Sequence, residues 1–538
     1  ILLRKNRVDD AIQEIRKVVD REDRDALAHN ILGSALMAKA MYAEGMEELN
    51  RALEIDPKLV DAHIKKGLLE LNKGKAEKAE TELNAAVQVN PELLDTRLLL
   101  ASYYVKRSDY RKAMEILTQG IKKQKSDAVL YTMMADILLR QKKVDEAVEY
   151  LQKAKTADPA YDVSYFKLAA IHYYKNEQKK GLEELESLQN IAPGNVKNLL
   201  AMASLHEAKG EDGEAIQSFR RAMETGKAEG YLGMASYYLR KKEQDKALSV
   251  LDEGIKKNPN EGSLYELKGN TLSAQKKNSD ALMAFENLEK IDSRSGLPYI
   301  VNTYILMGKP EKALEKIRKE SKKNPERLDL VAEISRIYAR MGKRDEAVNT
   351  AEQIIRSKPE SPVGYKALAV IYKDGNELDK GIEVLKKASR IKDADLYVML
   401  GNFHALKKEY APALERYREA EAIKPGYVPA LIQKGYLLHE QGKKNEAIAE
   451  YQKVLRLSQN NVGVLNNLAF LYAEDNRDLS MALQLASRAN MLAPNNGSVQ
   501  DTLGFVLIKN EKFAAAEKIL KRAVETMPGN ASVRYHLA

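Results

Sequence analysis

The sequence has 538 residues and contains neither cysteine nor tryptophan. Without cysteine, the chain can form no disulfide, no thiolate metal site and no cysteine nucleophile. It also lacks any apolar run close to the roughly 18 residues that a membrane-spanning helix requires. Positive charge is in modest excess, because 87 lysine and arginine residues face 78 aspartate and glutamate residues, which gives a net charge of +9. Nucleic-acid binding usually needs a larger excess clustered on one face, so the composition argues against it.

The two ends of the sequence look like cuts within a longer repeated pattern. It begins Ile1-Leu2-Leu3-Arg4, without an initiator methionine or the layout of a signal peptide. It ends at Ala538, within a repeated pattern. We therefore expect a fragment of a longer protein, with any signal sequence, lipid anchor or catalytic domain outside these residues.

A small residue recurs along the whole chain, mostly at intervals of 34 residues, with three intervals of 32 and one of 35. Such a period is typical of proteins built from stacked structural repeats. The recurring alanine and glycine residues are Ala11, Gly45, Ala79, Ala113, Ala147, Gly181, Ala215, Ala247, Ala281, Ala313, Ala347, Gly381, Ala413, Ala447, Ala482 and Ala516. A proline follows many of them by 12 residues, at positions 57, 91, 159, 193, 259, 325, 359, 425, 494 and 528.

The pattern around each small residue predicts two helices per repeat. If the small residue is placed at position 20 of the repeat, bulky and small residues also recur at positions 4, 8 and 11 and at positions 24 and 27. These steps of four and three put each trio on one face of an α-helix. Position 15 lies between the helices and often holds a residue that tolerates the left-handed backbone of a helix end. These residues are Gly74, Gly210, Gly308, Gly342, Gly442, Asn176 and Asn476.

The period and the spacing of small, bulky and proline residues resemble those of the tetratricopeptide repeat (TPR) family. The family's tryptophan at position 4 is replaced by tyrosine or histidine, as at Tyr131 and His63. The resemblance implies an all-α solenoid of about 15 helix-turn-helix repeats that form a right-handed superhelix. We expect a partial repeat at residues 1–25, fifteen tandem repeats in a single solenoid at residues 26–530, and the start of another at 531–538. Three repeats are shortened around residues 226–230, 292–296 and 392–394, where we expect local changes of twist rather than domain boundaries.

The sequence contains none of the common catalytic or nucleotide-binding motifs. Five of the seven histidines occupy packing positions of the repeat, and a metal site between His29 and His63 would need further ligands that the sequence does not supply. We therefore predict a protein that is not an enzyme in this segment and that binds no cofactor or metal.

The TPR resemblance implies that the first helix of each repeat lines an inner, concave groove. Two groups of residues in this groove are candidates for binding protein or peptide partners. The basic group resembles in kind the carboxylate clamp of some TPR co-chaperones, although Asp329 and Asp374 nearby could make it an ordinary solvated surface; it comprises Asn302, Arg336, Arg340, Lys366 and Lys373. The apolar group could bind a partner or be covered by the structure that follows it; it comprises Ile432, Tyr436, Phe470, Phe505 and Ile508.

Pairs of lysines recur just after the first helix of several repeats. Cations are favoured at helix C-termini by the helix dipole, which explains most of them. The alternative is a continuous basic edge that binds an anionic polymer, anionic lipid or an acidic partner. The pairs are Lys142-Lys143, Lys241-Lys242, Lys276-Lys277, Lys407-Lys408 and Lys443-Lys444.

The segment that includes Asn466–Ala469, Leu492–Pro494 and Asp501–Phe505 resembles a phrase of large bacterial TPR lipoproteins. Some of these are associated with exopolysaccharide export and the exosortase (PEP-CTERM) system. The resemblance implies a non-catalytic interaction scaffold in a bacterial envelope assembly for secretion or exopolysaccharide, so we favour a periplasmic or outer-membrane location over the cytoplasm. Three alternatives remain: the TPR arm of a larger enzyme such as a glycosyltransferase, a co-chaperone-like receptor for peptide tails, and a self-associating solenoid.

Overall fold

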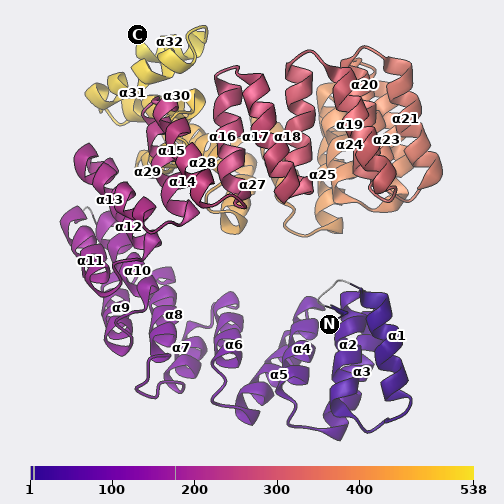
Figure 1. Ribbon diagram of the computed structural model, residues 1–538, viewed down its shortest axis with the longest axis vertical. Helices are drawn as coiled ribbons and strands as arrows, with labels where there is room; N and C mark the ends of the chain where they lie inside the picture. Colours follow the sequence, from indigo (N-terminus) through magenta and orange to yellow (C-terminus); the bar gives the residue numbers. More distant parts are fainter. Residues whose placement is uncertain (1, 4–6, 176) are drawn as a thin grey trace. The chain divides into compact units, whose positions relative to one another are not determined.

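The computed structural model describes residues 2–3, 7–175 and 177–538. In these residues the fold is all-α, and Figure 1 shows the helices following one another as antiparallel pairs. The predicted α-solenoid of helical repeats is therefore confirmed. Asn176 and residues 1 and 4–6 of the predicted partial repeat lie outside the described residues. Among those described, no helix is both long and apolar enough to cross a membrane.

The chain divides into two compact units, residues 1–271 and 272–538, and the division falls within α16 (Gly262–Ala274). In the first unit the first helices of the repeats are α2 (Ala26–Ala38), α4 (Val60–Asn72), α6 (Leu94–Lys106), α8 (Asp127–Arg140), α10 (Asp162–Tyr174), α12 (Val196–Lys209) and α14 (Ala228–Arg240). The second helices are α1 (Val8–Val19), α3 (Tyr42–Ile55), α5 (Ala76–Val89), α7 (Tyr110–Thr118), α9 (Val144–Ala157), α11 (Gln178–Ile191), α13 (Asp212–Glu224) and α15 (Gln244–Lys257).

The second unit has the same alternation. Its first helices are α18 (Ser293–Leu306), α20 (Leu328–Arg340), α22 (Pro362–Asp374), α24 (Ala394–Leu406), α26 (Val428–Glu440), α28 (Val462–Glu474), α30 (Gly497–Lys509) and α32 (Ala531–Leu537). Its second helices are α17 (Asn278–Ile291), α19 (Pro310–Lys323), α21 (Arg344–Ser357), α23 (Leu378–Ala388), α25 (Tyr410–Ile423), α27 (Lys444–Leu457), α29 (Leu479–Leu492) and α31 (Phe513–Thr526).

The small residues allow the two helices of a repeat to approach closely. A Cβ atom added at Gly435, at position 8, would lie 2.5 Å from the ring of Tyr451, which is fully buried at position 24. At the same position of another repeat, Gly401 would place a Cβ atom 2.4 Å from the ring of Tyr417. The recurring alanine at position 20 is also fully buried, as at Ala147. Bulky residues at position 24 therefore fill the space that small residues leave, as the sequence pattern predicts.

The turn between the two helices has the same backbone in every described repeat. Its residue at position 15 has a positive φ, a conformation that costs an L-residue roughly 1–2 kcal/mol unless it is glycine. The predicted turns at the five glycines and at Asn476 are thus confirmed, while Asn176 is not among the described residues, and other residue types also adopt this conformation. The residues concerned are Ala40, Gly74, Ser108, Lys142, Gly210, Lys242, Lys276, Gly308, Gly342, Asn376, Lys408, Gly442, Asn476 and Glu511.

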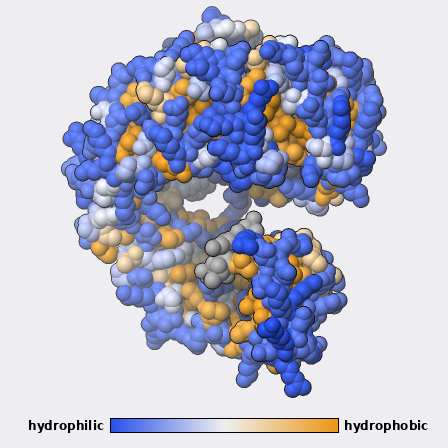
Figure 2. Space-filling view, turned by 45° about the vertical axis from the view of Figure 1, so that its right-hand side comes forward, coloured by the Kyte–Doolittle hydropathy of each residue, from blue (hydrophilic) through white to orange (hydrophobic). Residues whose placement is uncertain are grey.

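First helices of successive repeats contact one another directly, as α20 does with α22 and α28 with α30. This close approach makes the first helices the inner face of each array and leaves the second helices on its outer face. Figure 2 shows a largely hydrophilic surface on which hydrophobic residues appear as separate strips.

The three shortened repeats are accommodated at the connection between repeats. Between α17 and α18 only Asp292 remains, and its side chain accepts a hydrogen bond from the backbone N–H of Arg294. After α23 the chain forms a short 3₁₀ helix, Ser389–Ile391, and then turns at Lys392 in the left-handed conformation. The division between the two units lies at none of these connections. The predicted changes of twist stay a prediction.

Two nearby glycines, one in a turn and one in the helix that follows it, allow a test of the left-handed turn conformation. Gly210 has φ +79° and Gly213, in the first turn of α13, does not have a positive φ, while neither has a neighbour within 4 Å of an added Cβ. We expect Gly210→Ala to lower the free energy of unfolding by about 1 kcal/mol because of backbone strain. We expect Gly213→Ala to raise it by about 0.5 kcal/mol because alanine favours the helix. Urea titrations followed by circular dichroism would measure both, and equal shifts of the two midpoints would contradict the assignment.

Candidate functional site

The predicted basic residues lie on three successive first helices of the second unit. Asn302 is on α18, Arg336 and Arg340 are on α20, and Lys366 and Lys373 are on α22. A cavity of about 410 Å³ lies between α18 and α20 and is lined by Asn302, Arg336 and Arg340. A second cavity, of about 540 Å³, lies between α20 and α22 and is lined by Arg336, Arg340 and Lys366. The structure therefore brings four of the five residues together, whereas Lys373 lines neither cavity.

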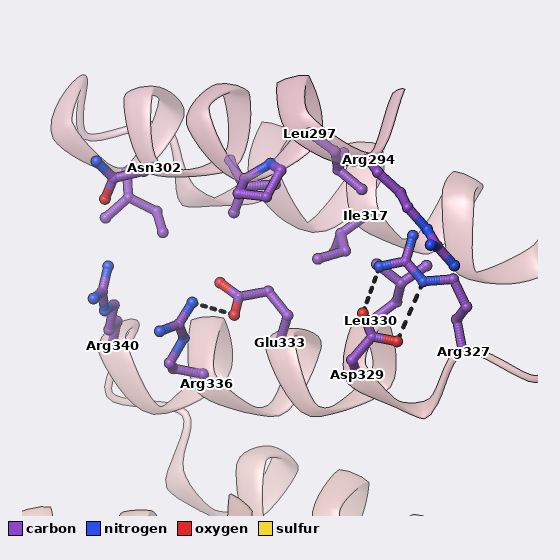
Figure 3. Close-up of a pocket in the computed structure, with 13 residues that line it drawn as sticks. Arg294, Leu297, Asn302, Ile317, Arg327, Asp329, Leu330, Glu333, Arg336 and Arg340 are labelled. Atoms are coloured by element: carbon purple, nitrogen blue, oxygen red, sulfur yellow. Dashed lines mark hydrogen bonds and ion pairs between the residues drawn. The ribbon is translucent and has the colours of Figure 1, made fainter. Parts of the chain in front are cut away.

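The first cavity, which we call the inner cavity, contains paired and unpaired arginines (Figure 3). Arg327 forms an ion pair with Asp329, with a shortest N–O distance of 2.5 Å, and Arg336 pairs with Glu333 one turn earlier on α20. In the described part of the chain, Arg340 and Arg294 form no ion pair. Figure 3 shows Arg340 pointing across the inner cavity toward Asn302. The guanidinium groups without an ion-pair partner among the described residues are therefore those of Arg294 and Arg340, and the charge of Arg294 also acts on the nearby Asp292 carboxyl.

The lysine of the second cavity, Lys366, is already neutralised. The Lys366 ammonium lies 2.9 Å from a carboxylate oxygen of Asp393 and 2.9 Å from one of Asp395. The hydroxyl of Tyr427 donates a hydrogen bond to Asp395, and this bond, followed by that from Lys366, lowers the pKa of the Asp395 carboxyl. Most of the remaining lining is apolar; it includes Ala332, Val363, Ala367, Val370 and Met399. Lys366 therefore contributes to holding α22 against α24 and is less available to a ligand.

Sequence reasoning missed three charged residues of the inner cavity. Arg294 follows the shortened connection after α17, where the repeat numbering no longer places it among groove positions. Arg327 lies just before α20, and its partner is Asp329, which the sequence suggested as a counter-charge for the whole basic group. Glu333 could have been found, because a carboxylate three residues before Arg336 on a helix lies on the same face and has the opposite charge.

The predicted apolar residues lie on α26, α28 and α30, and several of them pack on one another. The ring centroids of Phe470 and Phe505 are 5.4 Å apart, and Phe505 stacks on His536 of α32 at 5.0 Å. Phe505 and Ile508 are half-buried against the core between α28 and α31, and Ile432 is half-buried against the core next to α26. Neighbouring helices therefore cover part of this group.

Tyr436 is the exception in the apolar group, because its side chain is 46% exposed. Its ring meets that of buried Tyr451 edge-on, with the centroids 6.2 Å apart. Binding of a partner by the apolar group stays a prediction, with Tyr436 as its most accessible member.

The predicted lysine edge is divided between paired and unpaired side chains. Lys241, Lys407 and Lys444 each reach a carboxylate of a neighbouring repeat, at 2.7 Å, 2.6 Å and 2.7 Å. Such exposed pairs contribute little stability but reduce the net charge of the edge. The lysines in the left-handed turn position, Lys142, Lys242, Lys276 and Lys408, form no ion pair within the described residues. Binding of an anionic polymer along this edge stays a prediction.

Comparison with protein families supports the repeat assignment at several places. Models described as tetratricopeptide or TPR repeats match residues 1–60, 199–230, 328–361 and 435–476. A model described as anaphase-promoting complex, cyclosome, subunit 3 matches residues 72–154. The match at residues 328–361 includes α20 with its inner-cavity arginines.

Similar proteins align over parts of the chain. The human protein O-mannosyl-transferase TMTC1 is 27% identical over 218 residues, which are 39% of this chain and 24% of that protein. The bovine BBSome complex member BBS4 is 22% identical over 234 residues, 43% of this chain and 45% of that protein. The chain thus spans less than half of the length of either relative. Among solved structures, that of Naa15/Naa10 bound to HypK-THB aligns over 99% of this chain and 94% of the other with 15% identity and a TM-score of 0.38.

We expect the carboxylate of Asp395 to make the stability of the protein depend on pH. Its pKa is lowered in the folded state, so the stability that it contributes is present above its unfolded pKa, near 4, and is lost as the pH falls through the lower folded value. We expect Asp395→Asn to lower stability by about 0.5 kcal/mol at pH 6, as is typical of half-exposed ion pairs. The difference in stability between the wild type and this variant should shrink as the pH falls below 4. Thermal melting at pH 3 to 7 would test this.

Asp374→Asn is the matched control, because the Asp374 carboxylate lies 3.9 Å from Lys373 on the same helix and is otherwise exposed. We expect this variant to melt like the wild type at every pH. A constant deficit of Asp395→Asn down to pH 3 would contradict the role of its charge.

Proposed function

We propose that the chain, a tetratricopeptide repeat protein, is an interaction scaffold that holds an acidic segment of a partner protein in the inner cavity. The observation that carries the proposal is the presence of two guanidinium groups without an ion-pair partner within the residues that the structure describes, those of Arg294 and Arg340, in a cavity whose lining is partly charged and partly apolar. Guanidinium groups bind carboxylates through two parallel hydrogen bonds, which gives both strength and geometric selectivity.

The charge of the inner cavity supports an anionic ligand. Four arginines and two carboxylates line it, so its formal charge is 4 − 2 = +2. Two of the arginines are compensated by Asp329 and Glu333, and the positive charge that remains belongs to Arg294 and Arg340. Apolar side chains, among them Leu297 and Leu330, lie beside these cations. A peptide with carboxylates next to an apolar side chain would satisfy both parts of the lining.

The biological setting is proposed from the sequence. The resemblance of residues 466–505 to bacterial TPR lipoproteins supports a scaffold in an envelope assembly for secretion or exopolysaccharide, on the periplasmic or outer-membrane side. In that setting the inner cavity would hold a tail or loop of another component of the assembly.

A second candidate function is a TPR arm of a larger glycosyltransferase. The similarity to human TMTC1, which is named a protein O-mannosyl-transferase, favours it. Because the aligned region is only 24% of that protein, the transferase activity would have to reside in parts of a longer protein. The repeats would then present the acceptor protein to the catalytic part.

The proposed binding can be tested with a displayed library of random peptides selected on the purified protein. We expect enrichment of peptides that carry two carboxylates within a few residues of an apolar side chain. The double variant Arg294→Glu/Arg340→Glu should bind the selected peptides at least tenfold more weakly, because repulsion replaces two charge-assisted hydrogen bonds.

Lys408→Glu/Lys276→Glu is the control for net charge, since both lysines are exposed turn residues of the same unit. It changes the total charge equally and should alter affinity by less than twofold at 0.15 M salt, where distant charges are screened. The proposal would be contradicted if the wild type, the arginine double variant and the lysine double variant bound the peptides equally well. Selection of peptides without acidic residues would also contradict it.

The second candidate predicts a chemical product. If the repeats serve a mannosyltransferase, cells that express the full-length protein should add mannose to serine or threonine of co-expressed proteins. Deletion of the repeats should reduce this modification, which mass spectrometry of the acceptor peptides would measure. If the acceptor peptides carry the same amount of mannose whether the full-length gene is present or deleted, this candidate is excluded.

A further inference from the structure

A second groove lies on the outer face of the second unit, along α19. It has a volume of about 540 Å³, and its floor is formed by the apolar side chains Leu314, Tyr338 and Met341. Tyr338 belongs to α20, two residues from both Arg336 and Arg340, so it points away from the inner cavity that these arginines line. We call this the outer groove. It shares α20 with the inner cavity but none of its lining residues.

The helix that borders the outer groove is more basic than its neighbours. α19 carries six lysine and arginine residues and three glutamates, a charge of 6 − 3 = +3. The second helices on either side are acidic, with 1 − 3 = −2 for α17 and 2 − 3 = −1 for α21. The cations that line the outer groove are Arg318, Lys319, Lys322 and Lys343.

The cations of the outer groove lack the partners that cations at the matching helix positions have in the next two repeats. In the groove along α21 and α23, Arg356 lies 2.7 Å from Glu352, and Lys387 lies 2.7 Å from Glu383. By contrast, Lys319, Lys322 and Lys343 form no ion pair in the part of the chain that the structure describes. An equivalent position on the same scaffold can thus be neutralised by a glutamate one turn away, and in the outer groove it is not.

One cation is fixed over the aromatic floor. The Arg318 guanidinium lies 5.5 Å from the centroid of the Tyr338 ring and donates a hydrogen bond to the Tyr338 hydroxyl. Both contacts leave the positive charge uncompensated, because tyrosine is neutral. A planar cation held in place against an apolar floor binds a carboxylate with little loss of side-chain freedom.

We propose that the outer groove is a second binding site, which takes an acidic polypeptide segment with an apolar side chain. The apolar side chain would cover Leu314, Tyr338 and Met341, and the carboxylates would meet Arg318, Lys319 and Lys322. From Glu311 to Lys322 the groove extends over about 16 Å of helix, long enough for three turns of a docked helix. The inference goes beyond the proposed function, since it concerns another surface.

The acidic residues of the groove decide between classes of polyanion. Glu311 and Glu315 line it at the N-terminal end of α19. A nucleic-acid backbone carries a negative charge at every step and would be repelled there. A polypeptide can place its carboxylates at one end of the groove alone.

The test uses a fluorescein-labelled peptide of four Glu-Glu-Leu-Ala units and measures its anisotropy at 0.05 and 0.15 M salt. The protein carries Arg294→Glu/Arg340→Glu, so that the inner cavity does not contribute. We expect this protein to bind the probe, and we expect added Lys319→Glu/Lys322→Glu to weaken binding at least tenfold. The control, Lys380→Glu/Lys387→Glu, makes the same charge change in the next groove, where both lysines already have glutamate partners, and should weaken binding less than twofold. Melting curves verify that each variant is folded.

Several outcomes would overturn the inference. Loss of all binding in the inner-cavity variant alone would place the acidic site in the inner cavity and leave the proposed function intact. Equal weakening by the two lysine pairs would show a general charge effect. Tighter binding of a duplex DNA or of phosphatidylglycerol vesicles with the same sensitivity to Lys319 and Lys322 would assign the groove to another polyanion. A dimer seen by sedimentation without the probe, and abolished by the Lys319 and Lys322 changes, would assign it to a second copy of the chain.

Discussion

The close approach of two helices over a small residue is the contact on which the rest of the structure depends. Where Gly435 meets Tyr451, a single added carbon would lie 2.5 Å from the ring, so the helices can pack at this distance only if position 8 stays small. The same contact recurs in successive repeats, and each repeat buries its apolar face against the next one. Where position 8 is small, the path of the first helix, and therefore the place of its side chains on the inner face, follows from this contact; α18 departs from the pattern, because its position 8 is Val301.

The fold could be predicted from the sequence because its determinants are local and repeated. The alternation of small and bulky residues fixes which helix faces are buried, and the residue at position 15 ends the first helix even where it is a lysine such as Lys142. The pattern is weaker at the connections between repeats. The single residue Asp292 between α17 and α18 changes the phase of the repeat, which is why Arg294 was not recognised as part of the inner cavity.

The candidate site was predictable only in part, because it depends on charge pairing across helices. The sequence identified Arg336, Arg340 and Lys366 as groove residues, and they do line cavities. It could not show that Lys366 is held by two aspartates, Asp393 just before α24 and Asp395 in its first turn. Nor could it show that the ring of Phe505 packs against that of Phe470 and stacks on that of His536. Periodicity places a residue on a face, whereas its freedom to bind a ligand depends on neighbours that are about 30 residues away.

Uncompensated charge is therefore a more selective sign of function in this scaffold than charge itself. Many of its lysines and arginines form an ion pair with a carboxylate, as Lys366 and Lys407 do, and such exposed pairs are close to neutral in their effect on stability. An unpaired arginine or lysine beside apolar surface gains nothing from the fold, and it binds a carboxylate without first losing another partner. In the second unit this condition is met on both sides of α20, by Arg340 with Arg294 on the inner face and by Lys319 with Lys322 on the outer one. A single helix such as α20 can thus contribute to two separate sites, because residues two positions apart on it, such as Tyr338 and Arg340, face in nearly opposite directions.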